Sequence, residues 1–264
     1  MRKNTLKEFW ARGEATLNGW CSIPCSFTAE IMAHQGFDSI TIDMQHGLVD
    51  YQVAVTMLQA ISTTSVIPLT RVPWNDPAWV MKILDAGSYG VICPMINTPE
   101  DAESLVAACK YPPRGFRSFG PIRAKYYGGG GIHGGGDYHN FADEETLVIP
   151  QIETRQAINN LDAILEVPGI SAIYIGPSDL SMALGKEPRK GQSDPDVVKA
   201  KRTILDAARR HGIPAGIHTN SAEVAAEMIK QGFLFTSLQS DDRFLMSRAK
   251  EEVESVRGAI NPKG

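Results

Sequence analysis

Short apolar runs alternate with longer amphipathic segments along almost the whole chain. Eight of the runs have the length and the uniformly apolar character of parallel strands that are buried on both faces. They lie near residues 17–23, 38–43, 66–72, 89–95, 147–152, 170–175, 213–217 and 233–238. The segments between them carry apolar residues at helical spacing, as in residues 51–61. This alternation predicts parallel strands that are joined by crossover helices.

Several of the predicted helices begin with recognisable capping residues. Asp76, Thr98 and Asp194 are each followed by proline, and Ser221 precedes an amphipathic run. Such side chains accept hydrogen bonds from the free backbone N–H groups of the first turn, where proline is also favoured. The helix that begins after Asp76 is expected to end at Gly87, since glycine commonly follows the last turn.

The number of strand–helix units, about eight, indicates a closed (β/α)8, or TIM, barrel rather than an open sheet. Neither a linker nor a shift in composition interrupts the pattern, so we expect a single domain over residues 1–264. The exception is the stretch 112–145, which contains glycine runs at 128–131 and 134–136. We expect a long loop near the barrel mouth there, either a flexible surface excursion or a lid that faces the substrate.

The composition is that of a globular protein. Hydrophobic residues make up 43% of the chain, and the formal net charge of -4 comes without any basic block. A nucleic-acid partner is therefore not expected, because binding phosphates requires a positive face. The absence of a signal core and of a run long enough to span a membrane predicts a cytoplasmic protein with no membrane association. The four cysteines lie in or beside apolar runs and are expected to be reduced.

Side chains that can carry chemistry follow several of the predicted strands. Asp43 and His46 follow the second strand, Arg71 the third, Glu153 the fifth and Asp179 the sixth. The C-terminal ends of parallel strands meet at one mouth of a closed barrel. We therefore expect these residues to converge on a metal site with a base and an anion-binding group beside it.

The two carboxylates, Glu153 and Asp179, would repel each other at close range unless a cation or a proton lay between them. Hard oxygen ligands with open coordination positions suit Mg²⁺ or Mn²⁺. The alternative interpretation is that each of them caps the helix that follows its strand.

The other side chains suit acid–base and anion chemistry. An aspartate such as Asp43 can accept from one ring nitrogen of His46 and make the other more basic, as a general base requires. Alternatively, His46 faces solvent without a role. Arg71 suits capture of a carboxylate or an oxyanion, or else it forms a salt bridge to a loop acid. The backbone N–H groups of the turn after the sixth strand are placed to hold a substrate carboxylate.

Six segments in order along nearly the whole chain resemble the class II pyruvate aldolases of the HpcH/HpaI family. They are Asp43-Met-Gln-His-Gly47, Arg71-Val-Pro-Trp-Asn-Asp76, Leu84-Asp-Ala-Gly87, Tyr111-Pro-Pro-Arg-Gly115, Gln151-Ile-Glu-Thr154 and Ile175-Gly-Pro-Ser-Asp-Leu-Ser181. The last two are specific as a pair. The resemblance implies a (β/α)8 barrel in a homohexamer, a trimer of dimers whose C-terminal helix is exchanged between subunits. It also implies a carbon–carbon lyase similar to 2,4-dihydroxyhept-2-ene-1,7-dioate aldolase.

The resemblance further implies the chemistry of the site. Glu153 and Asp179 would bind a divalent metal (Mg²⁺, Mn²⁺ or Co²⁺). The Asp43–His46 pair would be the base, and Arg71 would stabilise the enolate of pyruvate. The substrates would be pyruvate and an aldehyde, or the 4-hydroxy-2-oxo acid that is their aldol adduct.

Other positions match the family in supporting roles. Gln151 would lie beside the metal, and Asp85 would reach the site of a neighbouring subunit. The backbone at Gly176 and Ser178 would hold the pyruvate carboxylate, and Trp20 would line the pocket.

The sequence departs from the family pattern in two places. Gln45 stands at a position that is often acidic in the family, and the glycine-rich stretch is not the usual pattern.

Two alternative functions remain. A lyase for malyl- or citramalyl-CoA thioesters would require a basic groove that the sequence does not show. The other alternative is a non-catalytic barrel that binds a metal and a keto acid. A Schiff-base aldolase is not expected, because the lysines lie on helices, loops or termini rather than at strand ends.

Overall fold

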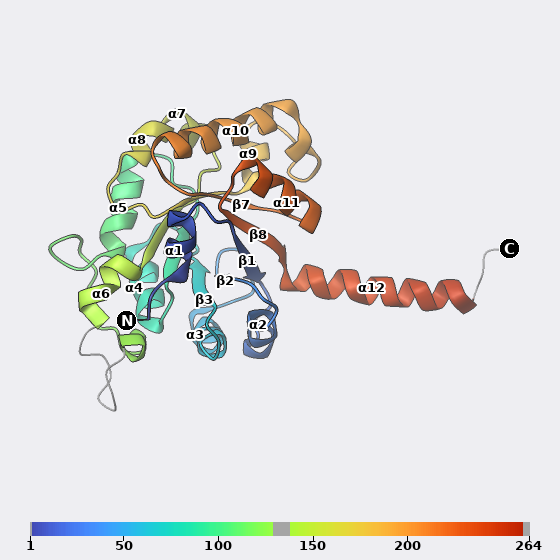
Figure 1. The fold of residues 1–264 in the computed structure, drawn as a ribbon, viewed down its shortest axis with the longest axis horizontal. Helices are drawn as coiled ribbons and strands as arrows, with labels where there is room; N and C mark the ends of the chain where they lie inside the picture. The colour runs from blue at the N-terminus through green and yellow to red at the C-terminus, as the bar shows by residue number, and fades with distance from the viewer. Residues whose placement is uncertain (1, 129–137, 261–264) are drawn as a thin grey trace.

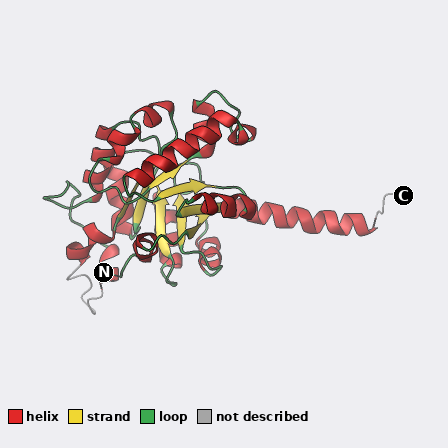
Figure 2. Cartoon of the chain, turned by 45° about the horizontal axis from the view of Figure 1, so that its top comes forward, coloured by secondary structure: helices red, strands yellow, loops and turns green. Residues whose placement is uncertain are grey.

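The computed structural model describes residues 2–128 and 138–260, and its strands form a closed parallel barrel surrounded by helices (Figure 2). The strands are β1 Thr16–Cys21, β2 Ser39–Asp43, β3 Ile67–Arg71, β4 Gly90–Cys93, β5 Leu147–Pro150, β6 Ile173–Ile175, β7 Ala215–His218 and β8 Phe235–Ser240. Their order around the barrel is β5-β4-β3-β2-β1-β8-β7-β6. The barrel closes where the Ser171 N–H donates to the Val148 carbonyl at 2.9 Å and the Ile152 N–H to the Tyr174 carbonyl at 2.8 Å. Every predicted strand is confirmed, with small shifts at its ends.

A helix follows each strand, α1 precedes β1, and most of the helices cover the outside of the barrel (Figure 1). They are α1 Thr5–Ala11, α2 Ser26–Ala33, α3 Tyr51–Ile61, α4 Pro77–Ala86, α5 Pro99–Cys109, η1 Ala124–Gly128, α6 Tyr138–Glu145, α7 Arg155–Asn159, α8 Leu161–Leu165, α9 Pro177–Ala183, η2 Lys190–Ser193, α10 Pro195–Arg210, α11 Ala222–Gln231 and α12 Asp241–Ile260. The predicted N-caps Asp76, Thr98, Asp194 and Ser221 are confirmed, because each accepts a first-turn N–H. Gly87 ends α4 in the left-handed region, with φ at 109°.

Side-chain alternation along the strands places one set of residues inside the barrel and the other against the helices. In β3, Ile67 and Leu69 belong to the interior cluster, which also contains Trp20 and Tyr174. Arg71 follows them at the same period of two and therefore faces the inside of the barrel at its C-terminal end. The outward set packs against the helices in a second, larger cluster. All four cysteines are free, as predicted, and Cys25 alone of the four is not buried.

The segment 112–145 differs from its prediction. It contains η1 and α6, and residues 129–137, which hold most of its glycines, lie outside the described residues. Its described part packs at the end of the barrel opposite the mouth, where Arg123 donates to the carbonyls of Ala86 at 2.7 Å and Leu58 at 3.3 Å. For the described part of the segment, the expected position near the mouth is wrong, because a connection from a helix back to the next strand returns to the N-terminal ends of the strands.

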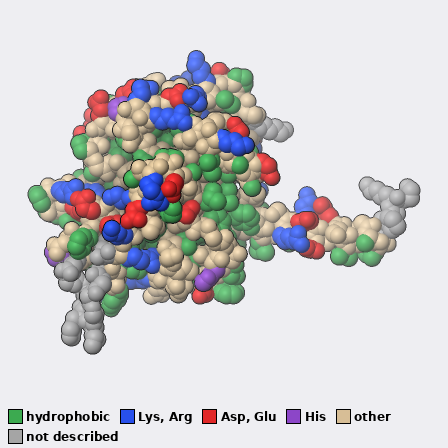
Figure 3. Space-filling model, in the orientation of Figure 1, with side chains coloured by type: hydrophobic (Ala, Val, Ile, Leu, Met, Phe, Trp, Pro, Cys, Tyr) green, Lys and Arg blue, Asp and Glu red, His purple; other side chains and the backbone are tan. Residues whose placement is uncertain are grey.

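Helix α12 extends away from the barrel (Figure 1), and Asp241 alone among its residues is buried. The exposed apolar side chains along it are Leu245, Met246, Val253, Val256 and Ile260. Figure 3 shows further hydrophobic side chains on the barrel beside the base of this helix.

Over the part of the chain that the structure describes, no helix combines the length and the apolar character that crossing a membrane requires.

Candidate active site

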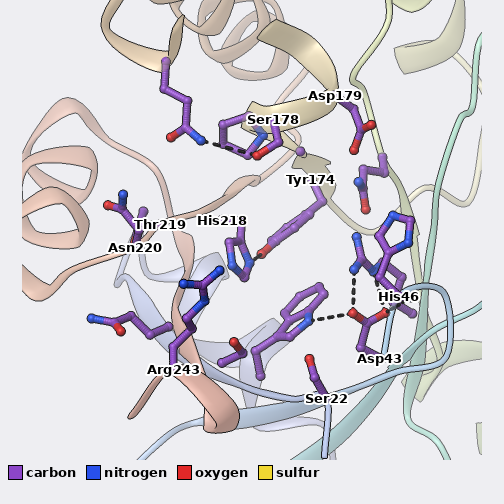
Figure 4. Close-up of a pocket in the computed structure, with 18 of the residues that line it drawn as sticks. Ser22, Asp43, His46, Tyr174, Ser178, Asp179, His218, Thr219, Asn220 and Arg243 are labelled. Carbon is purple, nitrogen blue, oxygen red and sulfur yellow. Dashed lines mark hydrogen bonds and ion pairs between the residues drawn. The ribbon is translucent and has the colours of Figure 1, made fainter. Parts of the chain in front are cut away.

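A pocket of about 540 Å³ opens at the C-terminal ends of the barrel strands (Figure 4). Every strand except β4 contributes to its described lining, from the strand's last two residues or from residues just beyond them. The strand-end residues are Trp20, Ser22, Asp43, His46, Arg71, Gln151, Tyr174, Gly176, Pro177, Ser178, Asp179, His218, Thr219, Asn220, Gln239 and Ser240, and Arg189, Gln192 and Arg243 complete the lining. The predicted convergence is therefore observed for Asp43, His46, Arg71 and Asp179, whereas Glu153 is not among the lining residues.

Asp43 and Arg71 form a bidentate ion pair at the pocket floor. The Arg71 Nε donates to Asp43 Oδ1 at 2.9 Å and its Nη2 to Oδ2 at 2.6 Å. The two residues are register partners on β2 and β3, so the strand pairing itself brings them together. Burial opposes ionisation of Asp43, but the charge and hydrogen bonds of Arg71, with the Trp20 N–H, hold its pKa below the usual range. The site thus contains a fixed carboxylate–guanidinium unit rather than a free arginine.

His46 is exposed at the pocket, and it is not paired with Asp43 in the way the sequence suggested. Asp43 Oδ1 accepts from the backbone N–H of His46 at 3.2 Å, whereas no hydrogen bond joins the His46 ring to any residue in the described ranges. The expected Asp–His side-chain pair is wrong in this structure because Arg71 occupies both carboxylate oxygens. The ring of His46 is left free to face a ligand in the pocket (Figure 4).

Glu153 and Asp179 lie just beyond the C-terminal ends of β5 and β6, the two strands that meet where the barrel closes. Glu153 is buried, and its carboxylate accepts from the Met95 N–H at 3.0 Å and from the Gln151 Nε2. Burial raises the pKa of Glu153, and the negative charge of Asp179 adds to this effect, which together outweigh the two hydrogen bonds. Neither residue is the N-cap of its helix: Thr154 caps α7, and Gly176 occupies that position in α9.

The surroundings of Glu153 fit a divalent cation. The Gln151 Oε1 is buried and has no hydrogen-bond partner among the described residues, so an amide oxygen with free lone pairs is available close to the Glu153 carboxylate, which the same amide contacts. A Cβ on Gly176 would come within 2.2 Å of Glu153 Oε2 and 2.6 Å of Gln151 Nε2, so only glycine leaves this space open. The described residues contain no group of three or more acidic, histidine or cysteine side chains that could hold a metal ion by themselves, so water and substrate oxygens would complete the coordination.

An aromatic floor separates the pocket from the barrel interior. The Trp20 ring stacks on Tyr174 with centroids 5.8 Å apart, and the Arg71 guanidinium lies 4.8 Å above the Trp20 ring. His218 meets the edge of Trp20 and shares a 3.2 Å hydrogen bond between its Nδ1 and the Tyr174 hydroxyl. Burial, with the nearby charge of Arg71, lowers the pKa of His218 to about 4, so its ring is neutral at pH 7.

Asp85 does not line the pocket of its own chain. It lies near the end of α4, at the opposite end of the barrel, and pairs with the fully buried Arg117 at 2.7 Å. Its expected contact with a neighbouring subunit concerns a chain that is not present here.

Sequence reasoning missed several lining residues on the far side of the pocket. Tyr174 supplies the partner that His218 lacked in the sequence, and Asn220, Gln239 and Arg243 come from the ends of β7 and β8. Their signal is the one that identified Asp43 and Arg71, a polar side chain just after a strand. It is weak for Arg243, which lies within a long helix.

Comparisons with known proteins agree with this geometry. A hydroxypyruvate/pyruvate aldolase of Rhizorhabdus wittichii is 37% identical over 96% of this chain and 99% of its own. A 4-hydroxy-2-oxo-heptane-1,7-dioate aldolase of Salmonella paratyphi A is 33% identical over 97% of this chain and 95% of its own. The crystal structure of a family protein from Burkholderia cenocepacia superimposes with a TM-score of 0.90 at 28% identity, over 97% of this chain and 100% of that one. Because the family's sequence model also matches residues 22–247, the chain belongs to the HpcH/HpaI aldolase/citrate lyase family.

Proposed function

We propose that this protein is a metal-dependent aldolase that cleaves or forms the carbon–carbon bond of 4-hydroxy-2-oxo acids through a pyruvate enolate. The main support is that Asp179 and Gln151 line the same pocket as the Asp43–Arg71 pair, and that the buried Glu153 carboxylate lies directly behind them, where it accepts from Gln151. The two relatives described above support this reaction class, since both are named as aldolases of 2-oxo acids.

Glu153 and Asp179 would hold the metal, with the Gln151 oxygen beside them. When bound, Mg²⁺, Mn²⁺ or Co²⁺ would polarise the 2-oxo group and stabilise negative charge on its oxygen. The raised pKa of Glu153 supports this role, because a buried carboxylate next to a second one is stabilised as an anion by a cation between them.

The protein's own groups would then act on the bound keto acid. The backbone at Gly176 and Ser178 holds the carboxylate of pyruvate. The Arg71 Nη1, which Asp43 leaves free, donates to the oxygen on which charge develops. His46 accepts the proton of the 4-hydroxyl group, the bond between C3 and C4 breaks, and the electron pair remains on the pyruvate enolate. A proton then returns to C3. The described lining contains no lysine, which argues against a Schiff base.

We also propose that the single barrel domain assembles in the cytoplasm into a homohexamer, a trimer of dimers in which α12 is exchanged between neighbours. The apolar side chains along α12 support this assembly, because their own chain leaves them uncovered. In such an assembly, Asp85 would approach the site of an adjacent subunit.

The proposed function can be tested by metal removal. The chelated protein should lose deuterium exchange at the pyruvate methyl group, and Mg²⁺, Mn²⁺ or Co²⁺ should restore it. Glu153→Gln and Asp179→Asn should each weaken Mn²⁺ binding measured by calorimetry, because each removes one anionic ligand. Glu223→Gln, at a fully exposed carboxylate on α11, is the matched control.

Two results would contradict the proposal. The first is full exchange activity in protein that elemental analysis shows to be free of metal. The second is tight binding of Mn²⁺ and pyruvate without any exchange, which would instead favour the non-catalytic alternative.

A further inference from the structure

A second pocket, of about 370 Å³, lies at the end of the barrel opposite the mouth, among the residues that precede β5, β6 and β7. We call it the lower pocket. Helix α1 forms one of its walls, and the Trp10 indole N–H fastens this helix to the barrel by donating to the Thr16 hydroxyl at 2.9 Å and the Leu234 carbonyl at 3.0 Å. The described linings of the lower pocket and of the pocket at the mouth share no residue, so the two are separate sites.

Two lysines of the lower pocket are held close together by the C-terminal end of α6. Lys110 Nζ donates to the carbonyl of Asp143 and, at 3.2 Å, to that of Thr146. Lys7 Nζ donates to the carbonyl of Glu144. An ammonium group has three N–H donors, and these bonds use two of Lys110 and one of Lys7. Both lysines therefore have donors left for a ligand in the pocket.

Lys110 is a buried cation without a carboxylate partner. The residue is only 6% exposed, and it forms no ion pair within the part of the chain that the structure describes. The two nearby carboxylates have other partners, because Asp143 accepts from the Tyr111 N–H at 2.9 Å and Glu144 pairs with Arg114. Burial lowers the pKa of Lys110 despite the negative charge of Asp143. An anion beside this ammonium would offset the cost of its burial.

The charge of the lower pocket suits a ligand with a single negative charge. The described lining has three cations, Lys7, Lys110 and Arg114, and two carboxylates, Asp143 and Glu144. A carboxylate ligand balances the one positive charge in excess, whereas a phosphate dianion would bring a second negative charge toward the two carboxylates.

A neutral donor lies beside the charged groups. Thr146 lines the lower pocket, and its buried hydroxyl has no hydrogen-bond partner among the described residues. Buried polar groups are usually paired, so an unpaired hydroxyl at a pocket indicates a place for a ligand oxygen.

The rest of the lining is partly apolar. Trp10, Ile170 and Pro214 belong to it. Because the indole N–H of Trp10 is already bonded to the barrel, this side chain offers a ligand only apolar surface. A pocket that combines an apolar wall with a few convergent polar groups is typical of sites for small organic molecules.

We propose that the lower pocket binds a small organic monocarboxylate. Lys110 and the Thr146 hydroxyl hold the carboxylate group, and the apolar body of the ligand packs against Trp10. The ligand is bound without being changed chemically. This site does not depend on the proposed aldolase function, because it shares no residue with the pocket at the mouth.

The test compares 4-bromobenzoate with its neutral analogue 4-bromobenzamide. Titration calorimetry should show that the carboxylate binds about tenfold more tightly than the amide, because it gains charge-assisted hydrogen bonds. Inorganic phosphate should bind more weakly than 4-bromobenzoate. Anomalous scattering from bromine in a soaked crystal should place the bromine beside Trp10, with the carboxylate at Lys110.

Two variants test the groups that hold the carboxylate. Lys110→Met should weaken the binding of 4-bromobenzoate about tenfold and leave that of the amide unchanged. Thr146→Val should weaken it about threefold, and the fold should tolerate this change, because it keeps the shape and removes a hydroxyl without a partner. Lys199→Met is the matched control for net charge, since Lys199 is exposed on α10 and lines neither pocket, and it should bind like the wild type.

Several results would overturn the inference. They are equal affinity for acid and amide, tighter binding of phosphate than of 4-bromobenzoate, unchanged affinity in Thr146→Val, and bromine that binds at crystal concentration only. A loss of affinity in Arg243→Gln instead of Lys110→Met would overturn it as well, because Arg243 lines the pocket at the mouth. None of these results bears on the proposed function, which is measured by pyruvate exchange.

Discussion

At the scale of single residues, the charge of Arg71 is balanced before any substrate binds. Asp43 takes two of its donors, and the guanidinium also covers the face of Trp20. A rigid, net-neutral unit of this kind can present its free Nη1 to a developing oxyanion without rearranging during the reaction.

Arg71→Ala should therefore have two separable effects. It should lower kcat by about 10²–10³-fold, because it removes a donor that acts chiefly on the enolate. It should also lower the free energy of unfolding by about 3–5 kcal/mol, since it leaves the buried Asp43 carboxylate unpaired. Steady-state kinetics and chemical denaturation measure the two effects.

The double variant Arg71→Ala/Asp43→Asn separates them. It should recover much of the stability, because no buried charge is left alone, but none of the kcat. An Arg71→Ala protein within a few-fold of the wild-type kcat would refute the role assigned to this residue.

The sequence identified which residues gather at the pocket but not how they pair. Asp43, Arg71 and Asp179 were found because strand ends converge in any barrel. Pairing Asp43 with His46 followed from their closeness in the chain, whereas the partner in the structure comes from the register of two parallel strands. A residue such as Tyr174 was missed because a strand that is apolar on both faces does not reveal which of its side chains face the inside of the barrel.

At the scale of elements, helix starts were predicted best where a capping side chain and a proline mark them. Thr98 and Asp101 form a reciprocal pair of cap hydrogen bonds, and this pattern can be read directly from the sequence. Helix α6 lacks such a signal. Only Tyr138 and Ala142 are buried in it, so its apolar spacing is too sparse to distinguish it from a loop.

The segment that contains α6 is held to the barrel by a buried ion pair. Arg117 has no exposed side-chain surface, pairs with Asp85 of α4 at 2.7 Å and lies 4.6 Å above the Tyr111 ring. Its Nε and Nη1 have no hydrogen-bond partner among the described residues, so Asp85 is the main compensation for its charge.

Asp85→Ala should therefore destabilise the protein by about 3–5 kcal/mol, because it leaves the Arg117 cation buried and uncompensated. Thermal or chemical unfolding of the intact protein measures this. Replacing both residues, as Arg117→Met/Asp85→Ala, should cost less than Asp85→Ala alone. A stability unchanged by Asp85→Ala would show that the pair does not hold the segment in place.

At the scale of the whole molecule, the barrel could be predicted by counting strand–helix units. In a barrel of such units the strands pair in the order in which they occur along the chain, so the number of units is enough to predict the fold. The number of units does not indicate which surface another copy of the chain would cover. Relative to Leu245, the positions of Met246, Val253, Val256 and Ile260 fall within about 100° of arc on an ideal helix, so α12 carries one apolar stripe. A stripe of this kind on a helix that leaves its own barrel is typical of a segment that packs against another subunit.

Val253→Asp/Val256→Asp should consequently dissociate the assembly, because it would place two carboxylates in an apolar contact without partners. Analytical ultracentrifugation should give the wild-type protein a mass that is a multiple of 28.8 kDa and shift the variant toward that value. Glu254→Gln, on the same stretch of helix, is the control and should leave the mass unchanged. If the wild type sediments as a monomer, α12 does not serve assembly. If the variant dissociates yet keeps its pyruvate exchange rate, each barrel carries a complete site, and Asp85 has no part in the site of a neighbour.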